Sequence, residues 1–452
     1  MFFGHNLSAS HGGGQKSGLR PARSSASVEL SGNCACRGAG ATRSGQRSLH
    51  SPGQHHLATF MQSAPPRPVW WATDFARWAL IAILIVATAA PASALEHVVL
   101  RREGRQQEVT GQLIVKAEDG GLLVQSADGV LWTIPPEELV EHTTDDTPFK
   151  PLSTADLGQR LLKDLPEGFE VHTTQHYIIA YNTSKAYAQW CGGLFERLYR
   201  AFTNYWTRQG FKLTEPRFPL VAVVFEDKAS YEQFAKSELG DAGGSIIGYY
   251  SLGTNRMTMY DMTGVESLRA PGDRRGSSAQ INLMLSRPEA AQTVATVIHE
   301  ATHQIAFNCG LQTRFADIPL WISEGIAVYF ETPDLNSAKG WRSTGAINPM
   351  RLAAFREYAP KRPADSIRTL VADDTRFRDT KQAIDAYAEA WALNYFLIRQ
   401  RPKQYHEYLH KLAERKPLIW DTPEERLAQF EAAFGNIATL DAELMKFIGK
   451  MR

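Results

Sequence analysis

Apolar residues recur three and four positions apart in the central part of the chain: Val294, Val297, Ile298, Ala301 and Ile305. This spacing predicts a helix that buries one face. Ser286, Pro288 and Glu289 precede the stripe and suit the start of a helix, because proline is tolerated in the first turn and an acid interacts favourably with the positive end. Gly310 suits its end.

Shorter patterns predict strands and helices before and after this central helix. We expect a strand or hairpin over 169–182, a helix over 185–209, a buried strand over 219–225, a helix over 228–237 and a strand pair over 248–252 and 255–261. Four amphipathic patterns predict helices over 385–399, 404–415, 424–434 and 439–448. This order predicts the α+β fold class.

Residues 95–145 predict a separate small β domain. Four β-prone runs are separated by Asp119-Gly120-Gly121 and Asp128-Gly129, which suit hairpin turns. We expect an SH3-like barrel or sheet that packs on the rest of the protein. Residues 143–151 are polar and contain two prolines, so they predict a linker. Residues 152–452 would then form the second domain.

Residues 1–94 predict a leader outside the fold. Residues 1–60 are rich in Gly, Ser, His and Arg, and Met61 is an alternative translation start. A short apolar run over 78–90 precedes Ala92-Ser93-Ala94, which is typical of a secretory signal cleaved after Ala94. The run is shorter than the ~20 apolar residues that span a bilayer. We therefore expect an exported protein, periplasmic or extracellular, with no stable membrane span unless the signal stays uncleaved and makes it membrane-associated.

The composition narrows the functional classes. Hydrophobic residues make up 43% of the 452 residues, which is enough for a sizeable core. The 49 Lys and Arg residues balance 48 Asp and Glu residues, and no basic block interrupts the folded part, so nucleic acid is not expected as a partner. Cys191 and Cys309 either pair in an oxidising compartment or are two small buried residues.

The predicted central helix carries an H-E-x-x-H motif. Its histidines, His299 and His303, are four residues apart and therefore lie on one helical face, where both can bind the same ion. Glu300 lies about 100° round from His299. Glu324, in a Trp-x-x-Glu-Gly setting, would be the third ligand and leave a fourth position for water, as in catalytic zinc sites. The alternative is a chance motif with packed or surface histidines, which the downstream glutamate makes the weaker interpretation.

This combination resembles the gluzincin metallopeptidases. Residues 321–329, W-I-S-E-G-I-A-V-Y, are most similar to the membrane alanyl-aminopeptidase and leukotriene-hydrolase branch, with a gap before the glutamate that is a residue or two longer here. The whole chain is similar to an exported bacterial gluzincin-like family of unknown substrates. The resemblance covers residues 286–400 and implies a zincin-like catalytic domain with a mixed-sheet upper lobe and a helical lower lobe. Such enzymes lay an extended substrate along an edge strand, for which residues 256–260 are the candidate.

A third segment, beginning at Tyr387, also resembles this branch. In those peptidases a tyrosine at the head of such a helix donates a hydrogen bond to the oxyanion, and Tyr387 follows Glu324 by 63 residues, a similar separation. The resemblance therefore implies a catalytic role for Tyr387. The sequence lacks a G-x-M-E-N segment, which grips the substrate amine in aminopeptidases. This departure favours an endopeptidase over an aminopeptidase.

These residues lead us to expect a zinc-dependent hydrolase of peptide or protein substrates. Zn²⁺ held by His299, His303 and Glu324 would activate water and polarise the scissile carbonyl group. Glu300 would take the proton of the water and deliver it to the leaving amine. Two alternatives stay open: a catalytically silent, zinc-containing envelope binding protein, and a metal hydrolase that acts on a non-peptide bond.

Four other residues are weaker candidates. Glu331 follows the third candidate ligand by about two helical turns and, like Asp317, is a candidate for orienting a ligand histidine; a solvated or capping role is the alternative for each. His172 and His176 have no acid or cysteine at ligand spacing. We interpret them as ordinary, partly exposed histidines.

Overall fold

The structure of the protein, a computed structural model, describes residues 94–240, 246–265, 275–333, 335, 341 and 344–451. The predicted signal segment and the alternative start at Met61 lie outside the described residues. Across the described ranges, no helix is long and apolar enough to cross a bilayer.

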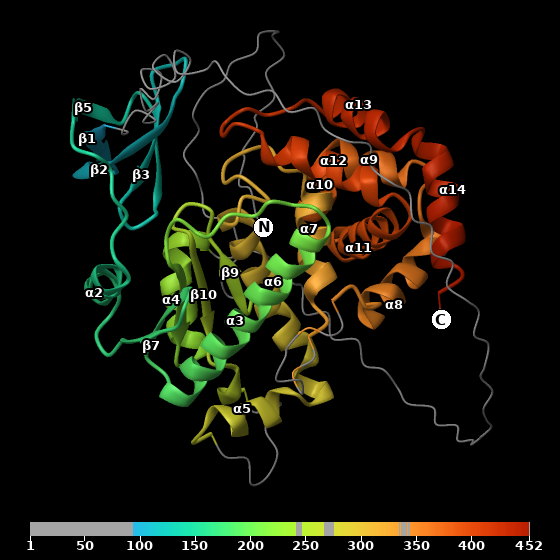
Figure 1. Ribbon diagram of the computed structural model, residues 1–452, viewed down its shortest axis with the longest axis horizontal. Coiled ribbons are helices and arrows are strands. Elements are labelled where there is room, and N and C mark those ends of the chain that lie inside the picture. Colours follow the sequence, from blue (N-terminus) through green and yellow to red (C-terminus); the bar gives the residue numbers. More distant parts are fainter. Residues whose placement is uncertain are drawn as a thin grey trace, which may run out of the picture. The chain divides into compact units, whose positions relative to one another are not determined.

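The first sheet of the described chain consists of five antiparallel strands in the order β4-β3-β2-β1-β5 (Figure 1). The strands are β1 (Leu95–Arg102), β2 (Arg105–Lys116), β3 (Leu122–Ser126), β4 (Leu131–Ile134) and β5 (Leu139–Asp145). Alternate residues of β1, including Val98 and Leu100, are buried in a small core with Leu122. Gly120 and Gly129 have positive φ angles, as the two predicted turns require. The four strands predicted from the β-prone runs are confirmed as β1 to β4.

The predicted linker over residues 143–151 is wrong at its first residues. Strand β5 continues to Asp145 and pairs with β1 through backbone hydrogen bonds. Most side chains of β5 are polar and exposed, so they lack the alternation that identifies a half-buried strand. Backbone pairing alone therefore extends the sheet here.

The second sheet is mixed and has the order β6-β7-β8-β10-β9 in the described chain. Its strands are β6 (Glu170–Thr173), β7 (Tyr177–Tyr181), β8 (Leu220–Phe225), β9 (Gly248–Tyr250) and β10 (Arg256–Tyr260). Strands β7, β8 and β10 are parallel to one another, whereas β6 and β9 are antiparallel to their neighbours. The strands and the hairpin predicted between residues 169 and 261 are confirmed.

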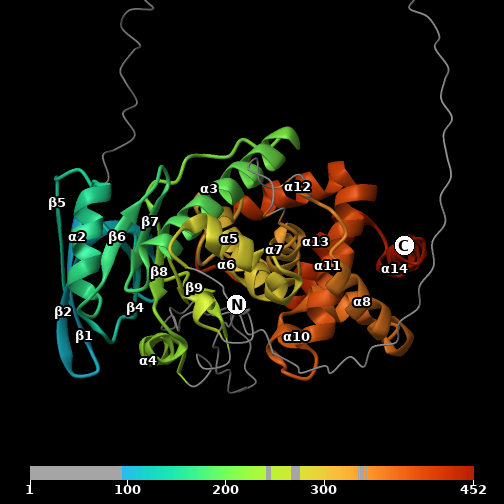
Figure 2. The same ribbon diagram turned by 90° about the horizontal axis from the view of Figure 1, so that it is seen from below.

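Helices cover both faces of the second sheet. The covering helices are α2 (Thr154–Asp164), α3 (Lys185–Arg208), α4 (Lys228–Leu239) and α6 (Ala291–Asn308). Ile178 and Ala180 of β7 join the core under α2 and α4, whereas Tyr177 and Ile179 join the core under α3 and α6. Figure 2 shows α3 and α4 on opposite sides of the sheet. Both faces are buried, which explains the continuous apolar sequence of β8.

The expected edge position of residues 256–260 is wrong. These residues form β10, which lies between β8 and β9, and β9 is the strand at that edge. Strand β9 has only three residues, and strand order depends on tertiary pairing rather than on the pattern within one strand. Among the described residues, the edge strand next to α6 is therefore Gly248–Tyr250.

The remainder of the described chain is helical. It contains α5 (Ser278–Leu285), α7 (Leu320–Phe330), α8 (Pro349–Tyr358), α9 (Ser366–Ala372), α10 (Thr375–Arg378), α11 (Ala383–Gln400), α12 (Pro402–Ala413), α13 (Pro423–Phe434) and α14 (Ile437–Ile448). Three short 3₁₀ helices are η2 (Met262–Gly264), η4 (Pro288–Ala290) and η5 (Ala359–Lys361). The four predicted C-terminal helices are confirmed as α11 to α14, whereas α2, α5, α8, α9 and α10 are not predicted by the patterns. The fold is mixed α+β.

Cys191 and Cys309 are both buried and unpaired, which matches the second of the two alternatives for them. Burial raises the pKa of the Cys191 thiol well above its usual range and that of Cys309 to about 12. Both side chains are therefore neutral, small apolar residues of the core.

Candidate metal centre

Helix α6 is buried on all sides because it lies between the second sheet and helices α3 and α7. Every residue from Val294 to Phe307 is buried. The prediction that this helix buries only one face is therefore wrong. Pro288 begins the 3₁₀ turn η4, which leads directly into α6. Gly310, with a φ angle of 80°, follows the last turn and ends the helix as predicted.

Helix α7, which carries Glu324, is also buried along its whole length. Its close packing on α11 explains the glycine after the glutamate, because a Cβ atom at Gly325 would overlap the amide of Asn394. That amide donates 2.8 Å hydrogen bonds to the carbonyl oxygens of Trp321 and Ala390, and so joins the two helices. The packing fixes the rotation of α7 and turns Glu324 towards α6.

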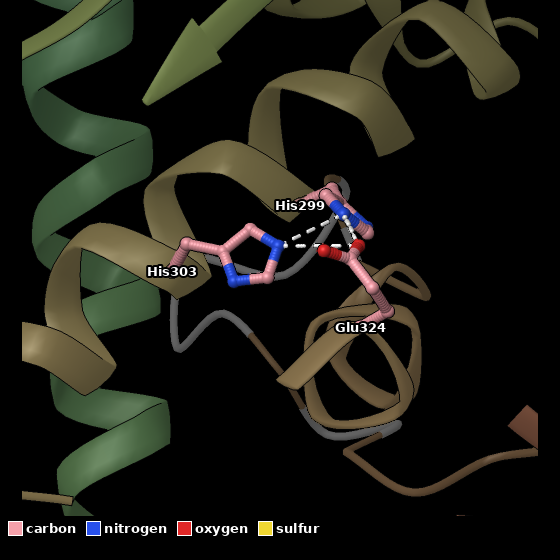
Figure 3. A group of neighbouring side chains, drawn as sticks. All are labelled: His299, His303 and Glu324. Atoms are coloured by element: carbon pink, nitrogen blue, oxygen red, sulfur yellow. Dashed lines mark hydrogen bonds and ion pairs between the residues drawn. The ribbon is translucent and has the colours of Figure 1, made fainter. Parts of the chain in front are cut away.

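His299, His303 and Glu324 converge at one point between α6 and α7 (Figure 3). The Nε2 atom of His299 lies 2.9 Å from Oε2 of Glu324 and 3.1 Å from Nε2 of His303, which is 3.4 Å from the same carboxylate oxygen. Ligand atoms at zinc–ligand bond lengths of ~2.0–2.1 Å in a tetrahedron are about 3.3 Å apart. The three atoms thus form a triangle of the size that a zinc ion requires.

The outer ring nitrogens of the two histidines face hydrogen-bond acceptors. Nδ1 of His299 lies 2.8 Å from Oε1 of Glu331, and Nδ1 of His303 lies 3.5 Å from Oγ of Ser323. Donation from Nδ1 directs Nε2 of each ring towards the space that faces Glu324. This is the orientation in which histidines bind metal ions.

The electrostatics of the cluster favour a cation. Burial alone would lower the pKa of His299, but hydrogen bonds to Glu324 and Glu331 and their charges raise it to about 10. Burial would raise the pKa of Glu324, whereas its interactions with His303 and His299 act to lower it. Negative charge thus persists on a carboxylate that is fully buried, and positive charge is stabilised beside it.

The formal charges of the buried groups point to a divalent ion. Glu300, Glu324 and Glu331 are 1%, 0% and 4% exposed, and Arg351 contributes one guanidinium, 3.1 Å from Glu331. When both histidines are neutral, as metal binding requires, three carboxylates and one guanidinium leave two negative charges. Buried charge is costly unless it is compensated. The donor set therefore fits a divalent cation in charge as well as in size.

Glu331 orients the ring of His299 through its contact with the outer ring nitrogen, Nδ1. Its carboxylate receives hydrogen bonds from Nδ2 of Asn348 and from the guanidinium of Arg351, at 3.1 Å each. Burial would raise the pKa of Glu331, but the charge of Arg351 and the contact with His299 lower it. Of the two roles considered for this residue, the structure agrees with histidine orientation.

Asp317 lies elsewhere. Its carboxylate accepts hydrogen bonds from Arg415 at 3.1 Å and Arg426 at 3.2 Å, so it belongs to a buried ion-pair cluster at the start of α7 and does not contact either histidine. Asp374 of the same cluster accepts from the first backbone N–H of α7, that of Leu320. These contacts anchor the helix that carries Glu324 to the C-terminal helices.

Replacement of Glu331 by glutamine is expected to weaken zinc affinity by about 10- to 100-fold without removing the metal site, because His299 loses the charged partner that orients it. Competition with a chromophoric chelator measures the affinity. Glu357, an exposed acid on α8, provides the control, and Glu357→Gln should leave the affinity unchanged. Equal affinities for the two variants would contradict a supporting role for Glu331.

Glu300 points from α6 to the edge of the second sheet. Its Oε2 atom accepts a 2.8 Å hydrogen bond from the backbone N–H of Tyr250, in β9, and its Oε1 atom is buried without a hydrogen-bond partner among the described residues. A buried carboxylate oxygen that receives no hydrogen bond within the fold is available to accept a proton from a bound molecule.

Tyr387 lies beside the same histidine as Glu331. Its ring centroid is 6.2 Å from that of His299, and the guanidinium of Arg351 lies 5.6 Å from the ring on α11. The side chain is 7% exposed. The structure thus places the ring of Tyr387 near that of His299, and its catalytic role stays a prediction.

The two other histidines considered earlier do not belong to this cluster. His176 is partly exposed, as predicted; its Nδ1 atom lies 2.8 Å from Glu196 and its ring stacks on Tyr199. It joins the turn between β6 and β7 to α3. His172, in β6, is half-buried, and burial lowers its pKa. Within the described residues, the one group of histidines and acids that could hold a metal ion is the cluster on α6 and α7.

Sequence patterns do not identify Arg351, Asn348 or the N–H of Tyr250 as parts of the site. Arg351 and Asn348 come from the start of α8, whose position depends on its packing against α11. Tyr250 contributes through its backbone, which carries no residue-specific signal.

Residues 293–419 match a family described as "Protein of unknown function (DUF1570)". The matched range contains the three donor residues, Glu300 and Tyr387. The comparison with curated proteins found no match.

Proposed function

We propose that the protein is a zinc-dependent peptidase with a zincin-like catalytic domain over residues 152–452 and an SH3-like domain over residues 95–145. His299, His303 and Glu324 would hold the metal ion. The observation that carries the proposal is the convergence of these three donors next to a buried carboxylate, Glu300, that faces a sheet edge. The zincin-like and gluzincin interpretation rests on the motifs together with this arrangement.

The position of Glu300 supports peptide hydrolysis in particular. Because the N–H of Tyr250 points at Glu300, the backbone groups of this residue face away from β10 and towards the outer edge of β9. An extended peptide that adds to this edge by strand pairing passes directly beside Glu300. The edge strand thus offers a route by which a main chain, rather than a small molecule, reaches the donors.

The residues of the chain have distinct chemical tasks in this proposal. When bound, zinc supplies Lewis acidity, which makes water more acidic and polarises a carbonyl group. Glu300 takes a proton from water on Oε1 while Tyr250 holds Oε2, and it then delivers the proton to the leaving amine. Tyr387 donates a hydrogen bond to the oxygen on which negative charge develops. Glu331 keeps the ring of His299 in place.

Two other functions are compatible with the same donors: a silent, zinc-containing binding protein and a hydrolase of non-peptide bonds. The experiment that separates them is a metal analysis of the full chain, together with digests of a peptide library and of ester and epoxide substrates, with and without chelator. The proposal expects one zinc per chain and peptide cleavage that stops with chelator and returns with zinc. Metal without cleavage of any substrate would favour the binding protein, and cleavage confined to non-peptide bonds would favour the other hydrolase.

Replacement of Tyr387 by phenylalanine is expected to lower kcat by about 100-fold with little change in KM, because the lost hydrogen bond acts on charge that develops only in the transition state. Steady-state kinetics on a cleaved peptide measure both constants. Tyr395, two turns further along α11 and equally buried, provides the control, since it packs on Tyr329 away from the donors. A similar loss in Tyr395→Phe would assign the effect to packing of α11.

A further inference from the structure

The turn between β3 and β4, residues 127–130, joins the first sheet to the turn that follows β9 in the second sheet. The backbone N–H of Leu131, the first residue of β4, donates a 2.8 Å hydrogen bond to the carbonyl oxygen of Gly253. The side chains of Leu123 and Leu131 belong to the large core around α6 rather than to the small core of the first sheet. The two sheets therefore share apolar packing as well as a backbone contact.

Arg314 connects the same two turns from a third segment, the loop after α6. The residue is 8% exposed, and its guanidinium donates hydrogen bonds to the carbonyl oxygens of Gly129 at 3.0 Å and of Leu252 at 3.1 Å. In the described part of the chain, no carboxylate forms an ion pair with this guanidinium. Displacement of either carbonyl group would leave a buried, charged donor without its partner, which is costly.

These contacts lie close to the group that holds Glu300. Leu252 follows Tyr250 by two residues, and the N–H of Tyr250 donates to Oε2 of Glu300 at 2.8 Å. Burial raises the pKa of the Tyr250 phenol to about 12, and the nearby charge of Arg314 opposes this rise. A shift of the turn after β9 would therefore move the N–H that orients the carboxylate.

Two other contacts hold the same turn from the second sheet's own helices. The side-chain amides of Asn255 and Asn308, on α6, donate to each other at 2.9 and 2.8 Å. Glu238, on α4, accepts a 2.6 Å hydrogen bond from the hydroxyl group of Ser251. The carbonyl oxygen of Leu252, which lies between these two points, is held by Arg314. The end of β9 thus depends in part on the first sheet for its position.

We propose that Arg314 and the β3–β4 turn are positioning elements of the catalytic site, which hold the end of β9 so that Tyr250 keeps Glu300 in its reactive orientation. The inference rests on the proposed peptidase function and adds to it two positioning residues, Gly129 and Arg314. It makes the first sheet a working part of the peptidase rather than a module for docking to another molecule. Misplacement of a catalytic group by about 1 Å can lower the rate about 100-fold.

Two glycines of the first sheet provide a matched pair of variants. Gly129 and Gly120 have φ angles of 85° and 92°, so replacement by alanine strains the backbone of either hairpin turn. A Cβ atom at Gly129 would lie 3.1 Å from the ring of Phe218 and displace the turn that contacts Arg314, whereas a Cβ atom at Gly120 would meet nothing within 4 Å. Arg314→Met removes both hydrogen bonds of the guanidinium, and Arg314→Lys retains a cationic donor.

In the full-length protein, Gly129→Ala and Arg314→Met are expected to speed hydrogen exchange of the Tyr250 amide by about ten-fold or more, because local opening of β9 becomes easier. Both should lower kcat for a cleaved peptide by about ten- to 100-fold, with zinc affinity unchanged. Gly120→Ala should match wild type in all three measurements, and Arg314→Lys should lose less activity than Arg314→Met. Thermal unfolding checks each fold; if Arg314→Met does not fold, Gly129→Ala and Arg314→Lys carry the comparison.

A double-mutant cycle tests whether the effect passes through Glu300. In the Glu300→Gln background, Gly129→Ala should change kcat by less than about two-fold, because the group that it misplaces has already lost its function. Equal losses in the two backgrounds, a fall in zinc affinity, or wild-type kcat in the folded variants would overturn the inference while the peptidase proposal stands. An effect of Gly120→Ala equal to that of Gly129→Ala would also overturn it.

Failure of the peptidase proposal itself would appear as the absence of cleavage by wild type. Amide exchange then decides the role of the first sheet alone. Faster exchange at Tyr250 in Gly129→Ala and Arg314→Met, but not in Gly120→Ala, would support positioning of β9 by the first sheet without peptidase activity. Equal exchange at Tyr250 in all of these proteins would overturn it.

Discussion

Replacement of Glu300 by glutamine is expected to lower kcat/KM for a cleaved peptide by about 100- to 10,000-fold, the range for loss of a general base or acid. The amide oxygen can still accept the hydrogen bond from the N–H of Tyr250, so the local fold should persist. What disappears is the basic oxygen that accepts a proton. Zinc content, measured by atomic emission on the same sample, should stay at the wild-type value.

The control for this substitution is Glu289→Gln, which alters an exposed acid in η4 and should leave both activity and zinc unchanged. Full activity of Glu300→Gln on a substrate whose cleavage requires metal would show that another group activates water. Loss of zinc together with activity would instead make Glu300 part of the metal site.

Replacement of Glu324 by glutamine is expected to reduce zinc affinity by more than the roughly 100-fold upper limit for an outer partner. Glu324 provides both a direct donor atom and a negative charge at the convergence point, and the amide is a weaker donor without charge. Titration calorimetry or chelator competition gives the affinity. Activity should fall in parallel, and excess zinc should restore it only in part.

Glu331→Gln is the matched comparison, because both acids are buried and both contact His299. A donor and a supporting residue differ in the size of the loss, so Glu324→Gln should have clearly the larger effect. The metal-free Glu324→Gln protein should unfold at a lower temperature than metal-free wild type, since the substitution removes the buried carboxylate that His299 contacts at 2.9 Å. Equal zinc affinities for the two variants would contradict the assignment of Glu324 as a ligand.

The elements of the site could be predicted to the extent that they depend on spacing along one helix. His299 and His303 are four residues apart, and helical geometry alone places them on one face. Glu324 could be linked to them only through the motif around it. Its actual approach depends on Gly325, which lets α7 pack closely on Asn394 of α11. That packing is a tertiary contact, and the sequence pattern of α7 does not reveal it.

Errors of prediction occurred where backbone pairing or helix packing decides the structure. Residues 256–260 were expected to form the edge strand of the second sheet. The three-residue strand β9, which follows α4, occupies that edge instead. Polar β5 joins its sheet through backbone hydrogen bonds. Arg351 reaches Glu331 only because α8 packs against α11. In each case the information lies in a partner segment and not in the local sequence.

The ion pairs of Asp317 have a consequence for synthesis of the protein. Asp317 precedes α7 and is held by Arg415 and Arg426, 98 and 109 positions further along the chain. The start of α7, the helix that carries Glu324, is therefore held by ion pairs with residues that leave the ribosome about a hundred codons after Asp317. A nascent chain that already contains both histidines and Glu324 lacks these ion pairs, so the ion-binding geometry matures only after Arg426 has been synthesised.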